Sequence, residues 1–536
     1  MGRFLNSIIP YASYEETYTD DYFVDKSLLI DELIPALSKK NRFLCITRPR
    51  RFGKSVMANM IGAFFGNIKD SGNIFKNLAI SKSPNFSKHL NQHKIIYIDF
   101  SRFPRNCNSY EQYINRIQDG INLDLSQAYS DLNIDTDDAV WDVLMDIFQA
   151  TSDKFIFIMD EWDAVFHADF ITEKAKREYL LFLKNLLKDQ VYVELAYMTG
   201  VLPIAKYSSG SELNCFLEYD MATSIRFSTY FGFSDAEIDV LFEKYKKLTD
   251  SPCITREDLK QWYDGYYTAG GCQIYNPRSI VCALTDNQLK NYWTSSGPYD
   301  EIFYYIQHNI EEVRDDLVLM ISGEGIETEI QSFAAISMKL HTKSEIYSAM
   351  VIYGLLTYKN KKVYIPNREL MEQFQKLLFT KDSLGYVYRL AKESERMLKA
   401  TLNGDTSTMV EILKYAHDTE SPIFSYNSEI ELSAVVNLVY LSARDKYRVE
   451  REDKAGEGYV DFIFYPEQKD LSGIILELKV DSSPENAIAQ IEKKGYILRF
   501  KGKLGEKPKY TGKVLAVGIS YNRKTKLHSC KIKILE

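Results

Sequence analysis

Residues 43–60 read FLCITRPRRFGKSVMANM, and this stretch decides the first part of the fold. The run Phe43–Thr47 is apolar, as a buried strand is, and a basic loop leads from it into a helix that begins at Lys54. Backbone amides in such a loop, together with the helix N-terminus, point at anions. The segment Gly53-Lys54-Ser55 therefore predicts a phosphate-binding loop, with Lys54 reaching the β- and γ-phosphates of a nucleotide and Ser55 holding magnesium.

One residue departs from the pattern GxxxxGK[ST], because Arg48 stands where the first glycine belongs. Glycine permits a tight turn at that position, so either Pro49 gives the loop another shape or nucleotide binding is weaker. An ordinary basic helix start is the alternative explanation for the short match. Arg50 and Arg51 are candidates for completing the site by proximity alone.

A second element lies at Phe155–Met159, an apolar run followed directly by Asp160-Glu161. In a phosphate-loop protein, an aspartate at the end of a buried strand coordinates magnesium through water or Ser55, and the next glutamate can polarise the attacking water. Asp160 is thus predicted as a magnesium ligand and Glu161 as a catalytic residue; a surface acid pair is the alternative. Thr199 ends the next apolar strand, where it would face the γ-phosphate, and a simple strand-ending turn is equally open.

Strand and helix patterns alternate over the first 230 residues. Strands are expected at 43–47, 94–100, 155–159 and 191–199, helices at 27–40 and 171–188, and a long amphipathic stretch at 109–150. This alternation predicts an α/β fold, in which helices lie on both faces of a parallel sheet. Residues 231–425 form a mainly helical lid and connecting region, and Ser234 with Glu237 predicts a capping box at its first helix.

Residues 426–536 have a third pattern. Helices are expected at 429–444 and 484–498, and strands at 447–450, 459–465, 473–480 and 513–520, which together predict a compact α/β unit. Alternate side chains of a strand share a face, so Glu477 and Lys479 point together. The turn at 466–471 folds two strands into a hairpin that can bring Asp461 beside them.

Asp461, Glu477 and Lys479 suit metal-dependent hydrolysis of a phosphodiester. The two carboxylates can bind a divalent cation, which lowers the pKa of its water, while the lysine orients that water or offsets developing charge. A cross-strand salt bridge on a solvated face is the alternative, but the run IILELKV surrounds Glu477 and Lys479 with apolar residues. Gln490 and Tyr496 could grip phosphate or base, or could belong to an ordinary amphipathic helix.

Composition narrows the classes of protein. The net charge is −8, yet residues 486–536 hold 13 Lys or Arg against 3 Glu, which suits either a phosphate-contacting face or a solvated basic tail. The 7 cysteines are scattered without CxxC spacing, which argues against a zinc site or a disulfide framework. No apolar run is long enough for a membrane span, so a cytoplasmic protein without membrane contact is expected.

Several motifs occur in one order along nearly the whole chain. They are TRPRRFGKS (47–55), IMDEWD (158–163), MTGV (198–201), WYDGYY (262–267), IYNPRSI (274–280), IPN (365–367), GYVDF (458–462), IILELKV (474–480) and AIAQIEKKGY (487–496). Together they resemble the bacterial AAA-ATPase-like proteins that carry a C-terminal domain of the PD-(D/E)XK nuclease superfamily.

This resemblance implies an AAA-type ATPase domain at 1–230 and a restriction-endonuclease-like α/β domain at 426–536. It assigns Lys54, Ser55, Asp160 and Glu161 to the nucleotide, and Asp461, Glu477 and Lys479 to the nuclease core. It also implies an acidic residue on the preceding helix, for which Glu431 is the choice and Glu429 the alternative. Gln490 matches the helix glutamine of the family, and an arginine-rich phosphate loop is usual in it.

The expected function is therefore binding and hydrolysis of ATP with Mg²⁺, coupled to a metal-dependent nuclease that acts on nucleic acid, with DNA the first choice. One alternative is a nucleotide-dependent switch or scaffold ATPase whose nuclease fold only binds nucleic acid. A pure interaction protein would need both sites to be inactive. Assembly into a homo-oligomer is left open.

Overall fold

A computed structural model describes residues 2–204, 212–293, 310–330, 342–380, 386–418, 429–455, 458–467, 471–500 and 512–535. The chain divides into two compact units, one formed by Met1–Ile302 with Glu327–Leu370 and the other by Phe303–Ile326 with Met371–Glu536. The three-part division at residues 230 and 425 stays a prediction, and its second boundary lies outside the described residues. No helix in these ranges is long and apolar enough to cross a membrane.

The first unit contains a five-stranded sheet in the order β2-β3-β4-β1-β5, with every neighbouring pair parallel. Its strands are β1 Phe43–Thr47, β2 Lys94–Asp99, β3 Phe155–Asp160, β4 Val193–Gly200 and β5 Leu217–Tyr219. β1 and β3 are buried over their whole length, which explains their unbroken apolar sequences. The predicted parallel sheet is confirmed, and its carboxyl edge carries Asp99 and Asp160.

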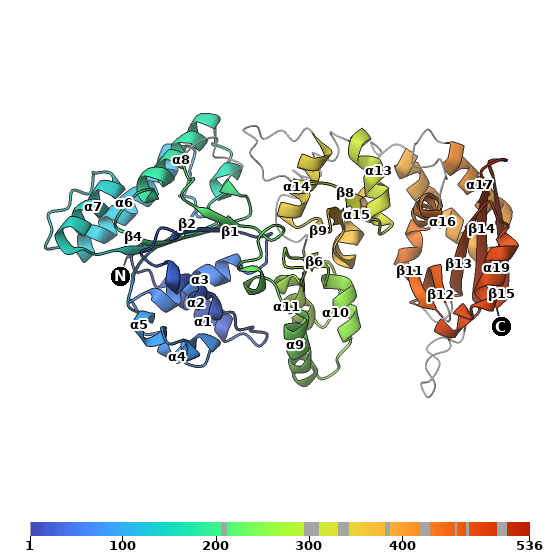
Figure 1. Cartoon of the computed structure of the whole chain (residues 1–536), viewed down its shortest axis with the longest axis horizontal. Helices are drawn as coiled ribbons and strands as arrows, with labels where there is room; N and C mark the ends of the chain where they lie inside the picture. Colours follow the sequence, from blue (N-terminus) through green and yellow to red (C-terminus); the bar gives the residue numbers. More distant parts are fainter. Residues whose placement is uncertain are drawn as a thin grey trace. The chain divides into compact units, whose positions relative to one another are not determined.

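Helices cover both faces of this sheet (Figure 1). One face packs against α6 Tyr110–Ala128, α7 Val140–Thr151 and α8 Glu173–Leu187, and the other against α1 Ile9–Tyr18, α2 Leu28–Leu33 and α3 Lys54–Phe65. Because side chains alternate along a strand, Phe157 of β3 enters the first core and Ile158 the second. The amphipathic stretch expected at 109–150 forms two helices, α6 and α7.

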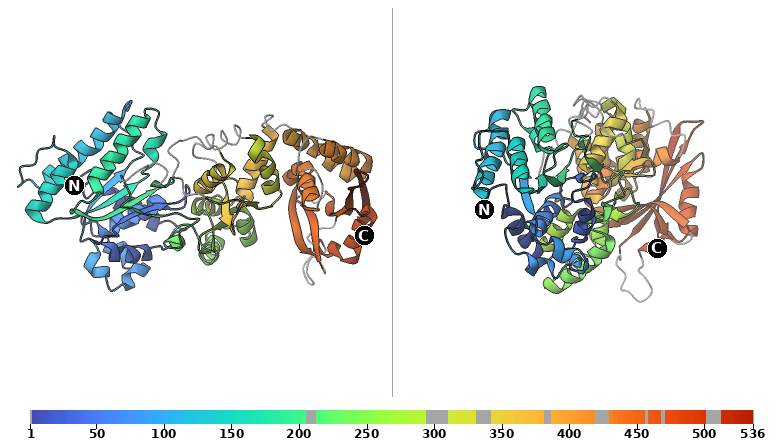
Figure 2. Two further views of the ribbon diagram at one scale, coloured as in Figure 1. Left: turned by 45° about the horizontal axis from the view of Figure 1, so that its top comes forward. Right: turned by 60° about the vertical axis from the view of Figure 1, so that its left-hand side comes forward.

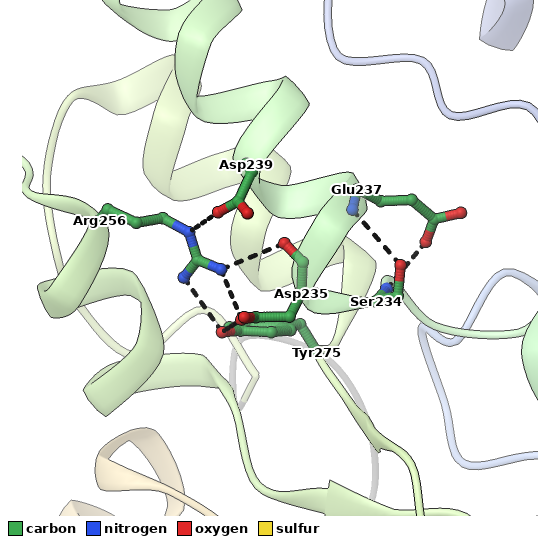
Figure 3. Close-up of polar contacts among 6 residues, drawn as sticks. All are labelled: Ser234, Asp235, Glu237, Asp239, Arg256 and Tyr275. Carbon is green, nitrogen blue, oxygen red and sulfur yellow. Dashed lines mark hydrogen bonds and ion pairs between the residues drawn. The ribbon is translucent and has the colours of Figure 1, made fainter.

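Three helices after the sheet form a smaller core. They are α9 Asp235–Leu248, α10 Arg256–Tyr263 and α11 Pro277–Asp286. The Ser234 hydroxyl accepts a hydrogen bond from the backbone N–H of Glu237 at 3.4 Å, and the Glu237 carboxylate accepts one from the backbone N–H of Ser234 at 2.8 Å (Figure 3). The predicted capping box is therefore confirmed.

Arg256, at the start of α10, connects this helix to α9 through ion pairs (Figure 3). Its guanidinium donates to Asp239 Oδ1 at 2.7 Å and to the Tyr275 hydroxyl at 3.1 Å, and it also pairs with Asp235. The Tyr275 hydroxyl in turn donates to Asp235 Oδ1 at 2.6 Å. Since α11 begins two residues after Tyr275, these contacts fix the approach to that helix.

The other described elements of the first unit are short, and they include two hairpins that the mainly helical pattern did not predict. The elements are α4 Gly72–Phe75, α5 Phe86–His89, β6 Tyr266–Tyr267 with β7 Gln273–Ile274, α14 Lys343–Tyr353, and β9 Thr357–Lys359 with β10 Lys362–Tyr364. Helix α15, Arg368–Thr380, begins in this unit.

The second unit contains one twisted sheet in the order β11-β12-β13-β14-β15 (Figure 2). Its strands are β11 Tyr447–Ala455, β12 Gly458–Pro466, β13 Gly473–Val480, β14 Val514–Asn522 and β15 Leu527–Leu535, and its helices include α13 Ile310–Ile321, α16 Tyr386–Asn403, α17 Thr406–Asp418, α18 Glu429–Val439 and α19 Pro484–Lys493. Only β13 and β14 are parallel, and α19 connects them. The predicted α/β unit is confirmed, whereas β15 was missed because Lys531 and Lys533 interrupt its apolar pattern.

Two layers of helices cover this second sheet. Ile463, Ile475 and Ala516 face α19, where they meet Ile488 and Ile491 in one core. Side chains of the opposite parity face the other way, and the ring of Phe464 packs against Tyr440, just after α18, with ring centroids 5.3 Å apart. Asp461, Glu477 and Lys479 have the parity of the α19 side.

We predict that Ser234→Ala lowers the free energy of unfolding by about 1 kcal/mol, because the helix loses its N-cap acceptor. Thermal unfolding of the full chain, followed for the transition of the first unit, measures the loss. Ser126→Ala is the matched control, since the Ser126 hydroxyl donates a hydrogen bond to the Leu123 carbonyl within α6 and caps no helix. Equal unfolding temperatures for the two variants would contradict the role of the cap.

Candidate functional site

The phosphate loop opens into a cavity of about 770 Å³ in the first unit. This volume is within the range of small-molecule sites. Gly53, Lys54 and Ser55 line the cavity, together with Asp160 and Glu161 from the end of β3. Gly53 precedes α3 with φ of 87°, a left-handed conformation that glycine adopts without strain. The structure thus brings these five predicted residues to one wall.

Asp160 is a buried carboxylate, only 3% exposed. Burial, and after it the charge of the neighbouring Glu161, raise its pKa to about 7, although a hydrogen bond with Ser55 and the charge of Lys54 act in the opposite direction. A cation beside Asp160 would therefore be stabilised. The carboxylate and the Ser55 hydroxyl are the oxygen donors that Mg²⁺ prefers, and nucleotide phosphates and water can complete its coordination.

Glu161 follows β3 in a strained conformation, with φ of 52°. Its backbone N–H donates to Asp160 Oδ1 at 3.1 Å, and its side chain lines the cavity. A non-glycine residue with positive φ persists only where its surroundings hold it. Here Trp162 and Asp163 hold the segment: the Trp162 backbone donates to the Thr199 carbonyl at 3.1 Å, and the Asp163 carboxylate accepts from the Leu202 N–H at 2.9 Å.

Thr199 is fully buried, and the described wall of the cavity does not include it. Its hydroxyl has no hydrogen-bond partner within the described part of the chain. The predicted contact of Thr199 with a γ-phosphate stays a prediction; in the structure, the turn after β4 packs the Thr199 backbone against Trp162. Gly200, the next residue, is so close to Trp162 that an added Cβ would lie 2.5 Å from that ring.

Arg48, which replaces the first glycine of the motif, is 1% exposed and turns away from this cavity. Its guanidinium donates to the carbonyls of Thr47 at 2.7 Å and Tyr219 at 2.8 Å, and lies 4.8 Å from the ring centroid of Phe231. Burial lowers the pKa of Arg48 to about 10. The arginine thus ties the start of the loop to β5, which favours the alternative in which the loop has a different shape.

Other cavity residues come from segments that the motif analysis did not assign to the nucleotide. Tyr22, Phe23 and Phe233 supply an aromatic part of the wall, and Arg278 lies at the start of α11 with an exposed side chain. Arg50 and Arg51 also line the cavity, as their proximity suggested. Arg278 belongs to the motif IYNPRSI, so the signal was present, but its distance along the chain hid its position.

In the second unit, Asp461 and Glu477 lie on neighbouring strands. The ladder between β12 and β13 ends at the pair Phe462 and Leu476, so the next residues, Asp461 and Glu477, are opposite each other. Beyond this pair, Asp461 Oδ2 accepts from the Leu478 N–H at 2.7 Å. The predicted convergence of the two carboxylates on one face is what the structure shows.

Glu477 is the centre of this cluster, and it is 2% exposed. Its Oε1 accepts from Lys479 Nζ at 3.2 Å and from the Gln490 amide, while Oε2 is buried without a hydrogen-bond partner among the described residues. Burial raises the pKa of Glu477 to about 7, and the charge of Asp461 adds to the rise. Tyr496 interacts with Gln490, so both predicted support residues lie near Glu477, while their contact with nucleic acid stays a prediction.

The alternative explanation was a salt bridge on a solvated face. The Glu477–Lys479 ion pair is instead largely buried. An unsatisfied carboxylate oxygen beside a second carboxylate fits a divalent cation, which would neutralise both. Within the described ranges, however, no three His, Cys, Asp or Glu side chains are placed to hold a metal. Glu431, in the first turn of α18, is thus not joined to the pair, and Glu429 is exposed. Water and substrate would have to supply the remaining ligands.

The basic C-terminal stretch is only partly described, because residues 501–511 lie outside the described ranges. Three of its described cations are in ion pairs within the second unit. Lys531 pairs with Glu485 at 3.2 Å. Lys533 pairs with Glu492, and Arg523 pairs with Asp481. These three ion pairs reduce the positive charge that the basic stretch can offer to nucleic acid.

Two segments of the chain match known families. Residues 9–209 match the AAA-ATPase-like family, described as predicted AAA-ATPases, and residues 433–528 match the PD-(D/E)XK nuclease superfamily. No curated protein matches the chain. The resemblance inferred from the motifs is confirmed for these two segments, while a bacterial origin stays an expectation.

Three solved structures illustrate the partial similarity of this chain to known proteins. The Walker-type ATPase PABY2304 of Pyrococcus abyssi is 12% identical over 65% of this chain and 94% of its own, with a TM-score of 0.34. A Signal Transduction ATPase with Numerous Domains from Pyrococcus horikoshii is 15% identical over 76% and 49%, with a TM-score of 0.23. The ORC2 protein of Aeropyrum pernix is 11% identical over 68% and 93%, with a TM-score of 0.27. These scores support no further argument.

The raised pKa of Glu477 predicts how the stability of the second unit depends on pH. The folded state keeps a proton up to about pH 7, whereas the unfolded carboxyl releases it near 4.5. Stability is therefore greatest below about pH 4.5 and falls as pH rises to about 7, with a total on the order of 3 kcal/mol from this group.

Urea unfolding in EDTA, between pH 5 and 8, measures this dependence as the difference between wild type and Glu477→Gln. The variant should lack this part of the decline. Glu485→Gln, at an exposed position, is the control and should follow wild type. Parallel curves for wild type and Glu477→Gln would show that the carboxyl titrates normally.

Proposed function

From a chain that joins an AAA-ATPase-like segment to a PD-(D/E)XK nuclease superfamily segment, we propose an ATPase coupled to a metal-dependent nuclease. One observation carries the nucleotide part of the proposal. Lys54 and Ser55, at the start of α3, and Asp160 and Glu161, at the end of β3, line a single cavity of about 770 Å³. Neither a basic helix start nor a surface acid pair accounts for that convergence.

The cavity offers distinct groups to the two ends of a nucleotide. The amides at the start of α3 and the Lys54 ammonium bind the phosphates, and Arg278 approaches them from α11. Phe23 and Phe233 provide apolar surface for the base. Glu161 orients and polarises the attacking water. Mg²⁺, held by Ser55 and Asp160, would neutralise charge on the phosphates when bound.

For the second unit we propose that Asp461 and Glu477 hold a divalent cation and that Lys479 acts on the attacking water. The supporting observation is the buried, unsatisfied Glu477 oxygen beside a second carboxylate. DNA is the proposed substrate and the cytoplasm the proposed location. Assembly into a homo-oligomer is compatible with the proposed ATPase and nuclease activities.

The described part of the chain offers no third protein ligand beside Asp461 and Glu477, and this favours a second candidate function. In that case the nuclease fold binds nucleic acid without cutting it, and the ATPase acts as a switch or scaffold. Magnesium-dependent nicking of plasmid DNA separates the two candidates, because a binding module shifts the DNA in a gel but leaves its strands intact.

We predict that Lys54→Ala weakens ATP binding by roughly 10- to 100-fold, because a charge-assisted contact with the phosphates is lost. Glu161→Gln should retain binding but slow hydrolysis by about 10²- to 10⁴-fold, as removal of a general base does. Calorimetry and phosphate release measure the two effects. Lys174→Ala, an exposed lysine on α8, is the control. Equal ATP affinity for wild type and Lys54→Ala would refute the site.

We predict that Asp461→Asn and Glu477→Gln each abolish cleavage while nucleic-acid binding persists. Lys479→Ala should slow cleavage by about 10²- to 10³-fold and spare metal affinity, because the lysine is not a ligand. Nicking assays with Mg²⁺ or Mn²⁺ and metal titrations by calorimetry measure both effects. Glu485→Gln is again the control. Cleavage by Asp461→Asn at the wild-type rate would exclude the assigned metal site.

A further inference from the structure

Glu369, near the start of α15, has a fully buried carboxylate that belongs to neither proposed site. Ser279 Oγ donates to both of its oxygens at 3.0 Å. The backbone N–H groups of Tyr292 and Trp293 donate to its Oε1 at 2.7 and 2.8 Å. One carboxylate therefore gathers donors from α11 and from the segment that follows it.

Both gathered segments reach the nucleotide cavity. Ser279 directly follows Arg278 in the first turn of α11, and Arg278 lines the cavity. The Arg51 guanidinium donates to the carbonyl of Tyr292, the residue whose N–H Glu369 holds. Arg51 lines the cavity as well, two residues before Gly53. Glu369 is thus one contact away from each of two cavity arginines.

The buried charge of Glu369 acts on Arg51 as well as on the hydrogen-bond donors. Burying a carboxylate is costly, and burial raises the pKa of Glu369 to about 7. The hydrogen bonds from Tyr292, Ser279 and Trp293 limit that rise, and the positive charge of Arg51 limits it to a smaller extent. The attraction between the Glu369 carboxylate and the Arg51 guanidinium favours a position of the arginine side chain near the carboxylate, at the edge of the cavity.

We propose that Glu369 is a positioning residue for the nucleotide site, which holds Arg51 through Tyr292 and Arg278 through Ser279 so that both face the phosphates. The inference rests on the proposed ATP site. According to this proposal, residues that follow the parallel sheet in the chain influence the affinity for the nucleotide. Glu369 touches neither nucleotide nor metal in this account, so its effect passes entirely through the two arginines.

The test is a double-mutant cycle on the full chain, with Mg·ATP affinity as the measurement. In Glu369→Gln, the amide oxygen can still accept from the backbone N–H groups of Tyr292 and Trp293. The negative charge is lost, however, which weakens these hydrogen bonds and the attraction for Arg51, and we expect an affinity loss of about tenfold. In the Arg51→Ala, Arg278→Ala background, the same change should have no further effect, because its targets are gone. Asp124→Asn is the matched control. That carboxylate is also buried and accepts from the N–H groups of Phe4 and Leu5 at 2.6 and 3.0 Å, away from the cavity.

Each outcome decides one point. Wild-type affinity in Glu369→Gln, or an equal loss with and without the two arginines, overturns the positioning role and leaves the ATP site standing. A similar loss in Asp124→Asn shows general destabilisation and also overturns it. If wild type and Lys54→Ala both fail to bind ATP, the proposed function fails and the inference falls with it. Should Glu369→Gln not fold, Ser279→Ala replaces it in the same cycle, with the arm through Arg278 as its target.

Discussion

The buried carboxylate of Asp160 is the constraint on which the first unit depends. Taking an ionised group out of water costs several kcal/mol unless opposite charge or hydrogen bonds compensate it. Here the compensation comes from Lys54 and Ser55, which start the helix after the neighbouring phosphate loop. Because β3 and β1 are parallel and belong to the same sheet, their carboxyl ends bring acid and base together at one edge. The geometry of the sheet thus produces the chemistry of the site.

The second unit meets the same constraint with a different sheet. Glu477 is buried at a point where β12 and β13 stop pairing, and a second acid, Asp461, lies opposite. In both units burial and a neighbouring carboxylate raise the pKa of the buried acid to about 7. A divalent cation would relieve both situations. A charge arrangement of this kind lowers stability and is usually kept for function.

The sequence predicted those features that local pattern and strand direction determine. Continuous apolar runs identified β1 and β3, and Lys54, at the end of the loop after β1, and Asp160, at the end of β3, line the cavity as expected. Alternation along β13 placed Glu477 and Lys479 on one face. The capping box at Ser234 followed from spacing alone.

Features that depend on tertiary packing could not be predicted. Arg278 and Glu369 reach the region of the cavity through helices whose docking no local pattern reveals. Thr199, expected to face the phosphates, lies near the end of β4 with its hydroxyl buried and without a hydrogen-bond partner among the described residues, and the strand pattern alone does not show this burial. Likewise, the docking of α18 decides where Glu431 lies, and a helical period cannot give that information.

The most direct test of the nucleotide site is a crystal structure of the full chain with Mg²⁺ and a non-hydrolysable ATP analogue. The account predicts phosphates within hydrogen-bond distance of the Gly53–Ser55 amides and Lys54 Nζ, with the metal between Ser55 and Asp160. Electron density for the analogue at any other place, or a cavity that stays empty at saturating analogue, would contradict it.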